Sequence, residues 1–176
     1  MTLASTTEYV SLESIRAAAA DLGGVAVRTP LLPADPLTQQ LGTPVFVKPE
    51  SLQRVGAFKL RGAWTLVRRL VREGATGVIT YSSGNHGQAV AYVAQRLGLR
   101  AVIVMPDTVS EAKRRGVERL GGEVVLAGRT SADRYDRAKE MAEAEGLAMA
   151  PPFDHESIER LVRDVKPRLE TLIAQG

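Results

Sequence analysis

The stretch ESLQRVGAFKLRGAW, residues 50–64, places a lysine where a helix would disfavour one. Lys59 follows a Gly-Ala-Phe turn and begins a segment with the apolar spacing of an amphipathic helix. The N-terminus of a helix carries partial positive charge, so acidic or capping residues are usual there. Arg61 adds a second positive charge two residues later. The pattern marks either a lysine with a chemical role or an exposed lysine that happens to begin a helix.

A second unusual segment is YSSGNHGQA, residues 81–89, which lies between a predicted strand and a predicted helix. It contains two hydroxyls, two glycines, an amide and an imidazole within a few residues. Gly84 and Gly87 would let the backbone approach a ligand closely, and the N-terminal amides of the following helix favour an anion. The alternative is an elaborate helix cap in which Ser83 or Asn85 is the capping residue, because polar caps are common.

These two segments lie in a regular alternation of predicted strands and helices. Apolar runs predict strands at 44–48, 77–83, 101–106, 123–128 and 147–152. Amphipathic segments predict helices at 11–24, 60–73, 86–98, 110–122 and 131–146. Alternation at this spacing indicates right-handed βαβ units, and therefore an α/β fold with a parallel sheet and flanking helices. The strands are apolar on both faces, as a sheet covered on both sides requires.

Composition narrows the function classes. With 44% hydrophobic and 24% charged residues, the 176-residue chain is expected to fold as one domain or two small lobes. The basic clusters at 67–73 and 111–120 have helical spacing, which indicates a solvated helix face. Few aromatic residues accompany their arginines, so we expect no nucleic-acid partner. Cysteine is absent, and neither a signal-peptide pattern nor a membrane-length apolar run is present. We therefore expect a cytoplasmic protein with no membrane partner.

The two chemical segments, taken together, resemble those of a known enzyme family. ESLQRVGAFKLRGA and SSGNHGQA are similar to motifs of the pyridoxal-phosphate enzymes of the tryptophan-synthase-β fold group (fold type II). The nearest members are the threonine/serine ammonia-lyases (dehydratases) and the serine racemases. VRTPLL (27–32), MPDTVSEAKRRGVERLGGEVVL (105–126) and APPFDHE (150–156) continue the resemblance in the same order. It implies that the parallel sheet is the small lobe of that architecture.

The resemblance implies that pyridoxal 5′-phosphate is the cofactor and that Lys59 forms a Schiff base with it. A lysine forms an imine only from its unprotonated amine. The like charge of Arg61 and desolvation against Phe58 would favour that form. Phe58 would lie against the pyridine ring, and Asn85 would hydrogen-bond the 3-oxygen of the ring.

The resemblance also implies a substrate site and a reaction. Ser82, Ser83, Asn85 and His86 would bind the carboxylate of a small hydroxy-amino acid, with His86 as a donor. Lys59 would remove the Cα proton of L-threonine or L-serine, and loss of the β-hydroxyl would lead to a 2-oxoacid and ammonia. Ser83 matches the serine proposed as the acid/base on the opposite face in racemases. The sequence suggests no metal site, since the polar residues around His155 are expected to be plain solvent contacts.

The resemblance predicts three parts of the chain. They are an N-terminal part of the large cofactor-binding domain at 1–52, a small α/β lobe at 53–146, and a crossing strand with a C-terminal amphipathic helix at 147–176. No glycine-rich loop of the kind that cups the cofactor phosphate follows residue 156, so the large domain is expected to be incomplete and turnover low. The alternative is a non-catalytic, truncated remnant that serves as a binding or assembly module. Uncovered apolar surface would favour a homo-oligomer.

Overall fold

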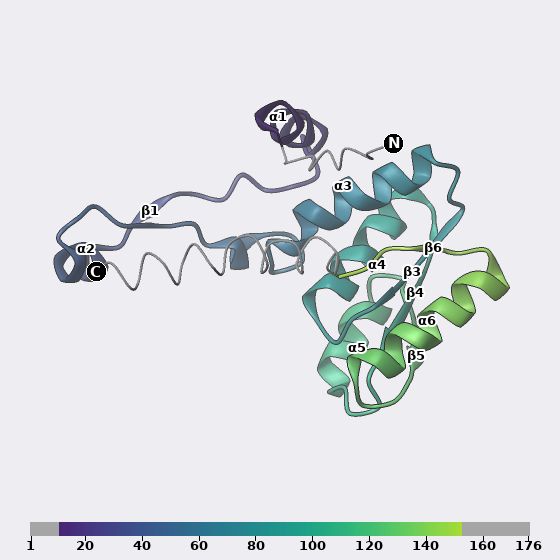
Figure 1. Cartoon of the computed structure of the whole chain (residues 1–176). Helices are drawn as coiled ribbons and strands as arrows, with labels where there is room; N and C mark the ends of the chain where they lie inside the picture. The colour runs from purple at the N-terminus through teal and green to yellow at the C-terminus, as the bar shows by residue number, and fades with distance from the viewer. Residues whose placement is uncertain (1–10, 153–176) are drawn as a thin grey trace, which may run out of the picture.

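The computed structural model describes residues 11–152 (Figure 1). Its elements follow in the order α1 (Leu12–Asp21), β1 (Leu32–Pro33), α2 (Asp35–Leu41), β2 (Phe46–Val47), the 3-10 helix η1 (Glu50–Leu52), α3 (Lys59–Arg72), β3 (Gly77–Tyr81), α4 (Asn85–Leu97), β4 (Arg100–Met105), α5 (Glu111–Glu118), β5 (Glu123–Leu126), α6 (Ser131–Glu145) and β6 (Ala148–Met149). The predicted C-terminal helix and His155 lie outside the described residues.

A four-stranded sheet in the order β5-β4-β3-β6 forms the centre of the fold. All three strand pairs are parallel, and Ile79 is in register with both Val102 of β4 and Met149 of β6. The predicted α/β fold with a parallel sheet and flanking helices is confirmed. The proposed boundaries at 52 and 146 stay predictions, although β6 lies beyond the second boundary and pairs within this sheet.

Side chains alternate across the sheet and divide the core between its two faces. One face packs against α3, α4 and α5, and its central residues include Val78, Ile103 and Met105. The other face packs against α6 through Ile79 and Val104. Figure 1 shows α6 on the opposite side of the strands from α3 and α4. Because both faces are covered, β3 is buried along its whole length.

Helix α3, which begins at Lys59, packs against its neighbours through one apolar face. Its buried residues are Leu60, Ala63, Trp64 and Val67. Val71, one helical turn beyond Val67, is 37% exposed. The buried face includes Trp64, whose indole N–H donates to the Asp21 carbonyl at the end of α1 (2.9 Å). Trp64 therefore joins α3 to the end of α1, while the helix packs mainly against α4.

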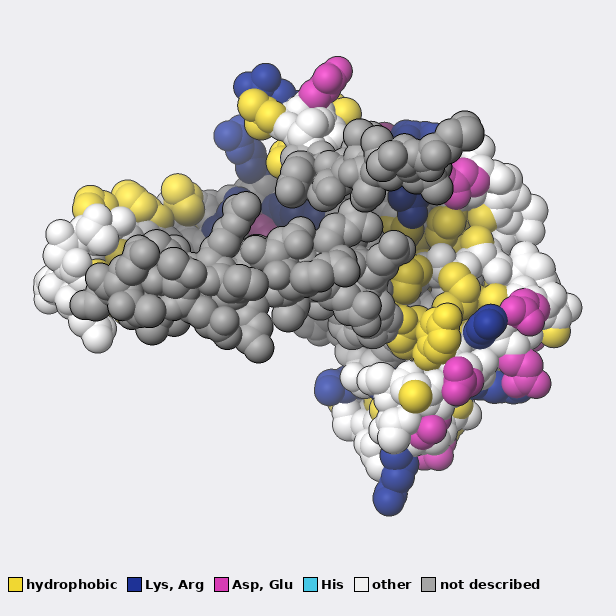
Figure 2. All heavy atoms as spheres, viewed as in Figure 1, with side chains coloured by type: hydrophobic (Ala, Val, Ile, Leu, Met, Phe, Trp, Pro, Cys, Tyr) yellow, Lys and Arg dark blue, Asp and Glu magenta, His cyan; other side chains and the backbone are white. Residues whose placement is uncertain are grey.

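The segment before α3 is an arm that leaves the parallel sheet (Figure 1). The strand predicted at 44–48 is reduced to β2, which pairs antiparallel with β1, and neither β1 nor α2 was predicted. The expectation that every strand is covered on both faces is wrong here, since Phe46 and Val47 are exposed. Hydrophobic side chains gather along this arm in Figure 2. Among residues 11–152, the helices are too short or too polar to cross a bilayer.

Two valines of α3 test this packing. Val67 is fully buried and Val71 is 37% exposed, so the same substitution should have different costs. We expect Val67→Ala to lower the free energy of unfolding by about 1–3 kcal/mol, because it leaves a cavity in the core. Val71→Ala should change it by less than about 0.5 kcal/mol. Urea unfolding followed by circular dichroism measures both, and equal losses would contradict the packing of α3.

Candidate active site

A cavity of about 300 Å³ brings the two chemical segments together. It lies where β3 ends and where α3, α4 and α6 begin, at the carboxyl edge of the parallel strands. Open α/β sheets bind their ligands at this edge. The lining residues are Phe58, Lys59, Tyr81, Ser82, Ser83, Gly84, Asn85, His86, Ser131, Arg134 and Pro152. Every site residue predicted from the sequence lines this space, which we call the Lys59 cavity.

Lys59 enters the cavity from the first position of α3. Its amine donates to the carbonyl of Pro152 (3.1 Å), which follows β6. The amine also lies 5.6 Å from the centroid of the Phe58 ring, within cation–π range. Phe58 is 61% exposed, so its ring is open to a planar partner but gives less desolvation than the sequence suggested.

Arg61 has a different role from the one expected. Its guanidinium donates to both carboxylate oxygens of Glu50, at 2.9 Å and 2.8 Å, and to the Val27 carbonyl at 3.2 Å. These bonds from Arg61, followed by one from Thr29, lower the pKa of Glu50 to about 2. The positive charge of Arg61 is therefore paired. Its like-charge effect on Lys59 stays a prediction, and the pair with Glu50 fixes the backbone that leads into α3.

The Glu50–Arg61 pair belongs to a network that joins segment 25–29 to the residues before α3. Thr29 donates its hydroxyl to Glu50 (2.7 Å) and accepts the Lys48 amine at its carbonyl (2.8 Å). The carboxamide of Gln53 bonds both the N–H (2.8 Å) and the carbonyl (3.0 Å) of Val27. These hydrogen bonds thus join the turn that precedes Lys59 to segment 25–29.

Ser82 shapes the loop between β3 and α4. Its N–H donates to the carbonyl of Val104 (2.9 Å), which extends the strand by one residue. Its hydroxyl accepts the N–H groups of Gly87 (3.1 Å) and Gly84 (3.3 Å). A side chain at Gly87 would lie 2.8 Å from Ile103, so only glycine fits there. The helix cap foreseen at Ser83 or Asn85 is therefore provided by Ser82.

The capping by Ser82 leaves part of the helix end open. Within residues 11–152, the N–H groups of Asn85 and His86 make no hydrogen bond. The side chains of Ser83 and Asn85 are exposed beside them on the cavity. Two free amides at the positive end of a 13-residue helix, next to a hydroxyl and a carboxamide, form a site for a small anion.

His86 differs from the expected carboxylate donor. The ring is 7% exposed, and its Nε2 lies 3.0 Å from the Ala150 carbonyl, which can only accept. Burial lowers the pKa of His86, and the positive charge of Lys59 lowers it further. The ring is therefore neutral, with its N–H donated to Ala150. His86 can offer a bound anion its backbone N–H, while its side chain ties the loop to β6.

Four lining residues were missed in the sequence: Tyr81, Ser131, Arg134 and Pro152. Tyr81 ends β3 inside the quoted loop motif, and its ring packs edge-on against Tyr135 at 5.4 Å. Arg134 lies near the start of α6. It could have been recognised from the sequence as Lys59 was, because it too is a cation near a helix N-terminus. Pro152 contributes a carbonyl, which no sequence pattern reveals. Within residues 11–152, no three His, Asp or Glu side chains gather as a metal site would require.

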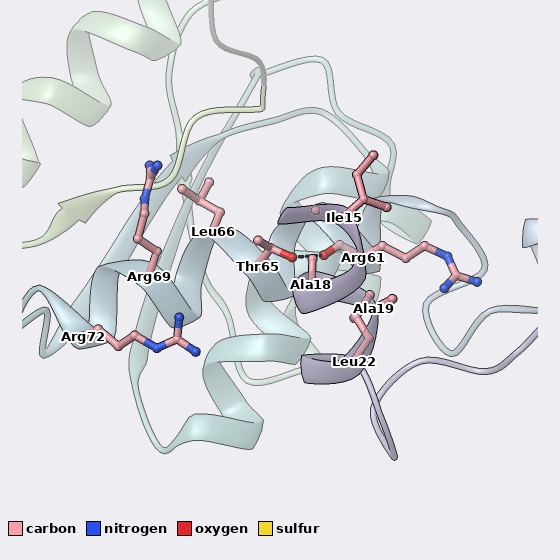
Figure 3. A pocket seen from close by; sticks show the side chains of 10 residues that line it. Ile15, Ala18, Ala19, Leu22, Arg61, Thr65, Leu66, Arg69 and Arg72 are labelled. Atoms are coloured by element: carbon pink, nitrogen blue, oxygen red, sulfur yellow. Dashed lines mark hydrogen bonds between the residues drawn. The ribbon is translucent and has the colours of Figure 1, made fainter. Parts of the chain in front are cut away.

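A larger cavity of about 680 Å³ lies between α1 and α3 (Figure 3). It is lined by small and apolar side chains such as Ala18 and Leu22, with the guanidinium groups of Arg69 and Arg72 nearby. The Thr65 hydroxyl there donates to the carbonyl of Arg61 (3.1 Å). The residues that line this cavity include no Asp, Glu, His or Lys that could act as an acid or a base, and Thr65 carries the one hydroxyl. We therefore place the site in the smaller Lys59 cavity.

Comparison with known proteins agrees with this geometry. The pattern of the family described as "Pyridoxal-phosphate dependent enzyme" matches residues 24–162. The chain belongs to this family. It is 47% identical over 135 residues to "Threonine dehydratase 1 biosynthetic, chloroplastic" from Solanum lycopersicum. This match covers 76% of this chain and 22% of that protein. It is 42% identical over 131 residues to "Serine racemase" from Schizosaccharomyces pombe, covering 74% of this chain and 41% of the relative.

A solved structure gives the same result for the fold. The processed form of threonine deaminase isoform 2 from Solanum lycopersicum has a TM-score of 0.71 at 41% identity. The match covers 82% of this chain and 41% of that one. The resemblance to the threonine/serine dehydratases and serine racemases is thus confirmed. The chain spans less than half the length of each of these three proteins, and the roles predicted for the site residues stay predictions.

The Glu50–Arg61 pair predicts a pH dependence. The folded-state pKa of Glu50, about 2, lies below its ordinary value of 4.5. Its carboxylate therefore stabilises the fold above pH 4.5, and this contribution is lost as the pH falls towards 2. We expect Glu50→Gln to cost about 1.5–3 kcal/mol at pH 7, because hydrogen bonds to a charged group are lost. The difference from the wild type should shrink as the pH falls from 4.5 towards 2.

Urea unfolding at several pH values measures this difference. Glu73→Gln is the matched control, because Glu73 lies in an exposed pair with Arg69 at 3.7 Å. Exposed pairs contribute little, so this variant should unfold like the wild type at every pH. A difference for Glu50→Gln that stays constant down to pH 2 would contradict the assigned pair.

Two adjacent serines test the cap of α4. Ser82→Ala removes the acceptor of two N–H groups, so we expect a loss of about 0.5–2 kcal/mol in the free energy of unfolding. Ser83→Ala removes an exposed hydroxyl that makes no hydrogen bond within residues 11–152, and should cost less than about 0.5 kcal/mol. Thermal unfolding of both variants checks the order. A greater loss for Ser83→Ala would show that the cap is misassigned.

Proposed function

We propose that the chain binds pyridoxal 5′-phosphate at Lys59 and takes part in an ammonia-lyase reaction on L-threonine or L-serine. The convergence of Lys59 with the open amides of Asn85 and His86 on one cavity carries this proposal. An amine and an anion site lie beside each other, although they come from different helices. That is the arrangement required to hold an amino acid by its carboxylate while a base reaches its Cα.

The residues of the Lys59 cavity fit the cofactor in three respects. The Lys59 amine is the nucleophile that would hold its aldehyde carbon. The exposed ring of Phe58 would lie against the flat pyridine ring, and the exposed carboxamide of Asn85 would donate to the ring oxygen. When bound, pyridoxal phosphate supplies an electron sink for the charge left at Cα.

The chain's own residues would orient the substrate and move its protons. The N–H groups of Asn85 and His86, with the hydroxyl of Ser83, would bind the substrate carboxylate at the positive end of α4. Ser82 would act indirectly, by holding this loop in shape. The Lys59 amine would take the proton from Cα, and Ser83 would stand on the opposite face as a second acid or base. The Pro152 carbonyl, which accepts from Lys59 at 3.1 Å, would hold the amine in place.

A second candidate function is a binding or assembly module without turnover. The observation that favours it is the apolar arm, where Leu31, Leu41 and Phe46 are 62%, 62% and 54% exposed. Side chains of this size grouped on a surface commonly mark an interface. We infer that the arm pairs with a second copy of the chain, so that the protein is a homo-oligomer. Cofactor binding without turnover would favour this second function.

Covalent trapping tests the cofactor site. The chain is incubated with pyridoxal phosphate, reduced with borohydride, digested, and searched by mass spectrometry for the labelled lysine. We expect the label on Lys59, its loss in Lys59→Arg, and no change in Lys139→Arg, which alters an exposed lysine of α6. Label spread over all lysines, or retained elsewhere at full yield in Lys59→Arg, would refute the proposal. The formation of 2-oxobutanoate from L-threonine, measured in parallel, separates a lyase from a binding module.

A further inference from the structure

A second polar cavity of about 400 Å³ adjoins the Lys59 cavity. Its lining residues are Ser83, Pro106, Thr108, Val109, Ser110, Lys113, Arg129 and Arg134. Ser83 and Arg134 line both cavities, so the two spaces adjoin each other. The second space lies where β4 ends and α5 begins. It is therefore the next position along the same edge of the sheet.

The charges of this second cavity are unbalanced. Three of its lining residues, Lys113, Arg129 and Arg134, are cations, and none is an acid. In residues 11–152, no ion pair involves any of these three side chains, although nine ion pairs are formed there by other arginines. Two of those arginines, Arg114 and Arg115, follow Lys113 directly on α5 and pair with Glu118 and Glu111. Other cations among residues 11–152, such as Arg119, also form no ion pair, so what distinguishes the cavity is that three cations line it together without an acid.

Arg134 gives an independent sign of a ligand. It is only 9% exposed, and its Nε is buried with no hydrogen-bond partner. The other two guanidinium nitrogens donate to neutral acceptors, the Ser131 hydroxyl at 3.0 Å and the Arg129 carbonyl at 3.5 Å. Backbone hydrogen bonds from Thr130 and Arg129 lower the pKa of Asp133 and the charge of Arg134 adds to this, but among residues 11–152 the two side chains form no direct ion pair. A buried cation without a direct anionic partner is costly, so such groups are normally paired. The partner of Arg134 is expected in one of the two cavities that it lines.

The start of α5 supplies further donors on the same side. Ser110 caps this helix by position, but its side chain makes no capping hydrogen bond. The N–H groups of Glu111 and Ala112 have no acceptor among residues 11–152. Free amides at a helix N-terminus favour anions, and here they stand beside an unpaired lysine and arginine.

We propose that this cavity is a second anion site, which binds a phosphate group. Three cations can neutralise a dianion, and a tetrahedral phosphate has enough oxygens to accept from several side chains and amides at once. The phosphate is either free or the end group of a phosphate monoester, since the same groups recognise both. Binding there would fix Ser83 and Arg134, which also line the Lys59 cavity, and would couple this anion to the substrate site. The proposal does not depend on the function proposed above.

Calorimetric titration of the 176-residue chain tests this site with two probes, inorganic phosphate and glycerol phosphate, at constant ionic strength. We expect saturable binding of one molecule per chain. Lys113→Gln and Arg129→Gln should each weaken it by about tenfold or more, because each removes a charged donor to the phosphate. Both residues are exposed, so the variants should stay folded. Arg114→Gln is the matched control, because it removes the same charge from α5 outside the cavity.

Binding of inorganic phosphate alone would identify a free phosphate as the ligand, and tighter binding of glycerol phosphate would identify a monoester. Either result supports the site if the two cavity variants weaken it and Arg114→Gln does not. Equal weakening in Arg114→Gln would show diffuse attraction and overturn the proposal. Failure of both probes to saturate would also overturn it. Lys59→Arg should bind phosphate like the wild type, which separates this test from the one for the cofactor.

Discussion

The pairing of β6 with β3 is the contact on which the candidate site depends. The Ala150 N–H donates to the Ile79 carbonyl (2.8 Å), which continues the parallel ladder beyond the last paired residues of β6. The chain then presents the carbonyls of Ala150 and Pro152 at the carboxyl edge of the sheet. The first accepts from the His86 ring and the second from the Lys59 amine. One short strand therefore holds both the loop after β3 and the amine of α3 in place.

The sequence predicted the parts of this arrangement that depend on local patterns. The strands β3, β4 and β5 and the helices between them follow from apolar runs, capping serines and terminal glycines. The motifs around Lys59 and residues 82–86 predicted which side chains share a cavity. Contacts made across long separations were not predictable in this way. Nothing near Trp64 indicates that it bonds the end of α1, and nothing near Arg61 indicates that Glu50 neutralises it.

The same limit applies within the loop itself. A capping residue is recognised by its type and its place, and Ser82, Ser83 and Asn85 all fit by type. Only the path of the backbone decides that the Ser82 hydroxyl points to the amides of Gly84 and Gly87. The His86 ring was predicted to donate to a carboxylate of the ligand. In the structure it is buried beside the Ala150 carbonyl, which supplies the acceptor that a buried donor needs and which no local pattern reveals.

The helix N-termini explain why anions fit this edge of the sheet. In a parallel sheet with helical crossovers, the helix that follows each strand begins at the same edge, so the positive helix ends gather there. The end of α6 is satisfied by its own acid, since Asp133 accepts the N–H groups of Arg129 and Thr130 at 2.8 Å and 2.9 Å. The first turn of α4 has no acid, and Glu111 in the first turn of α5 is paired with Arg115. Neither adjoining cavity is lined by an acid. The fold has thus left two neighbouring positive ends open to ligands, with Ser83 and Arg134 between them.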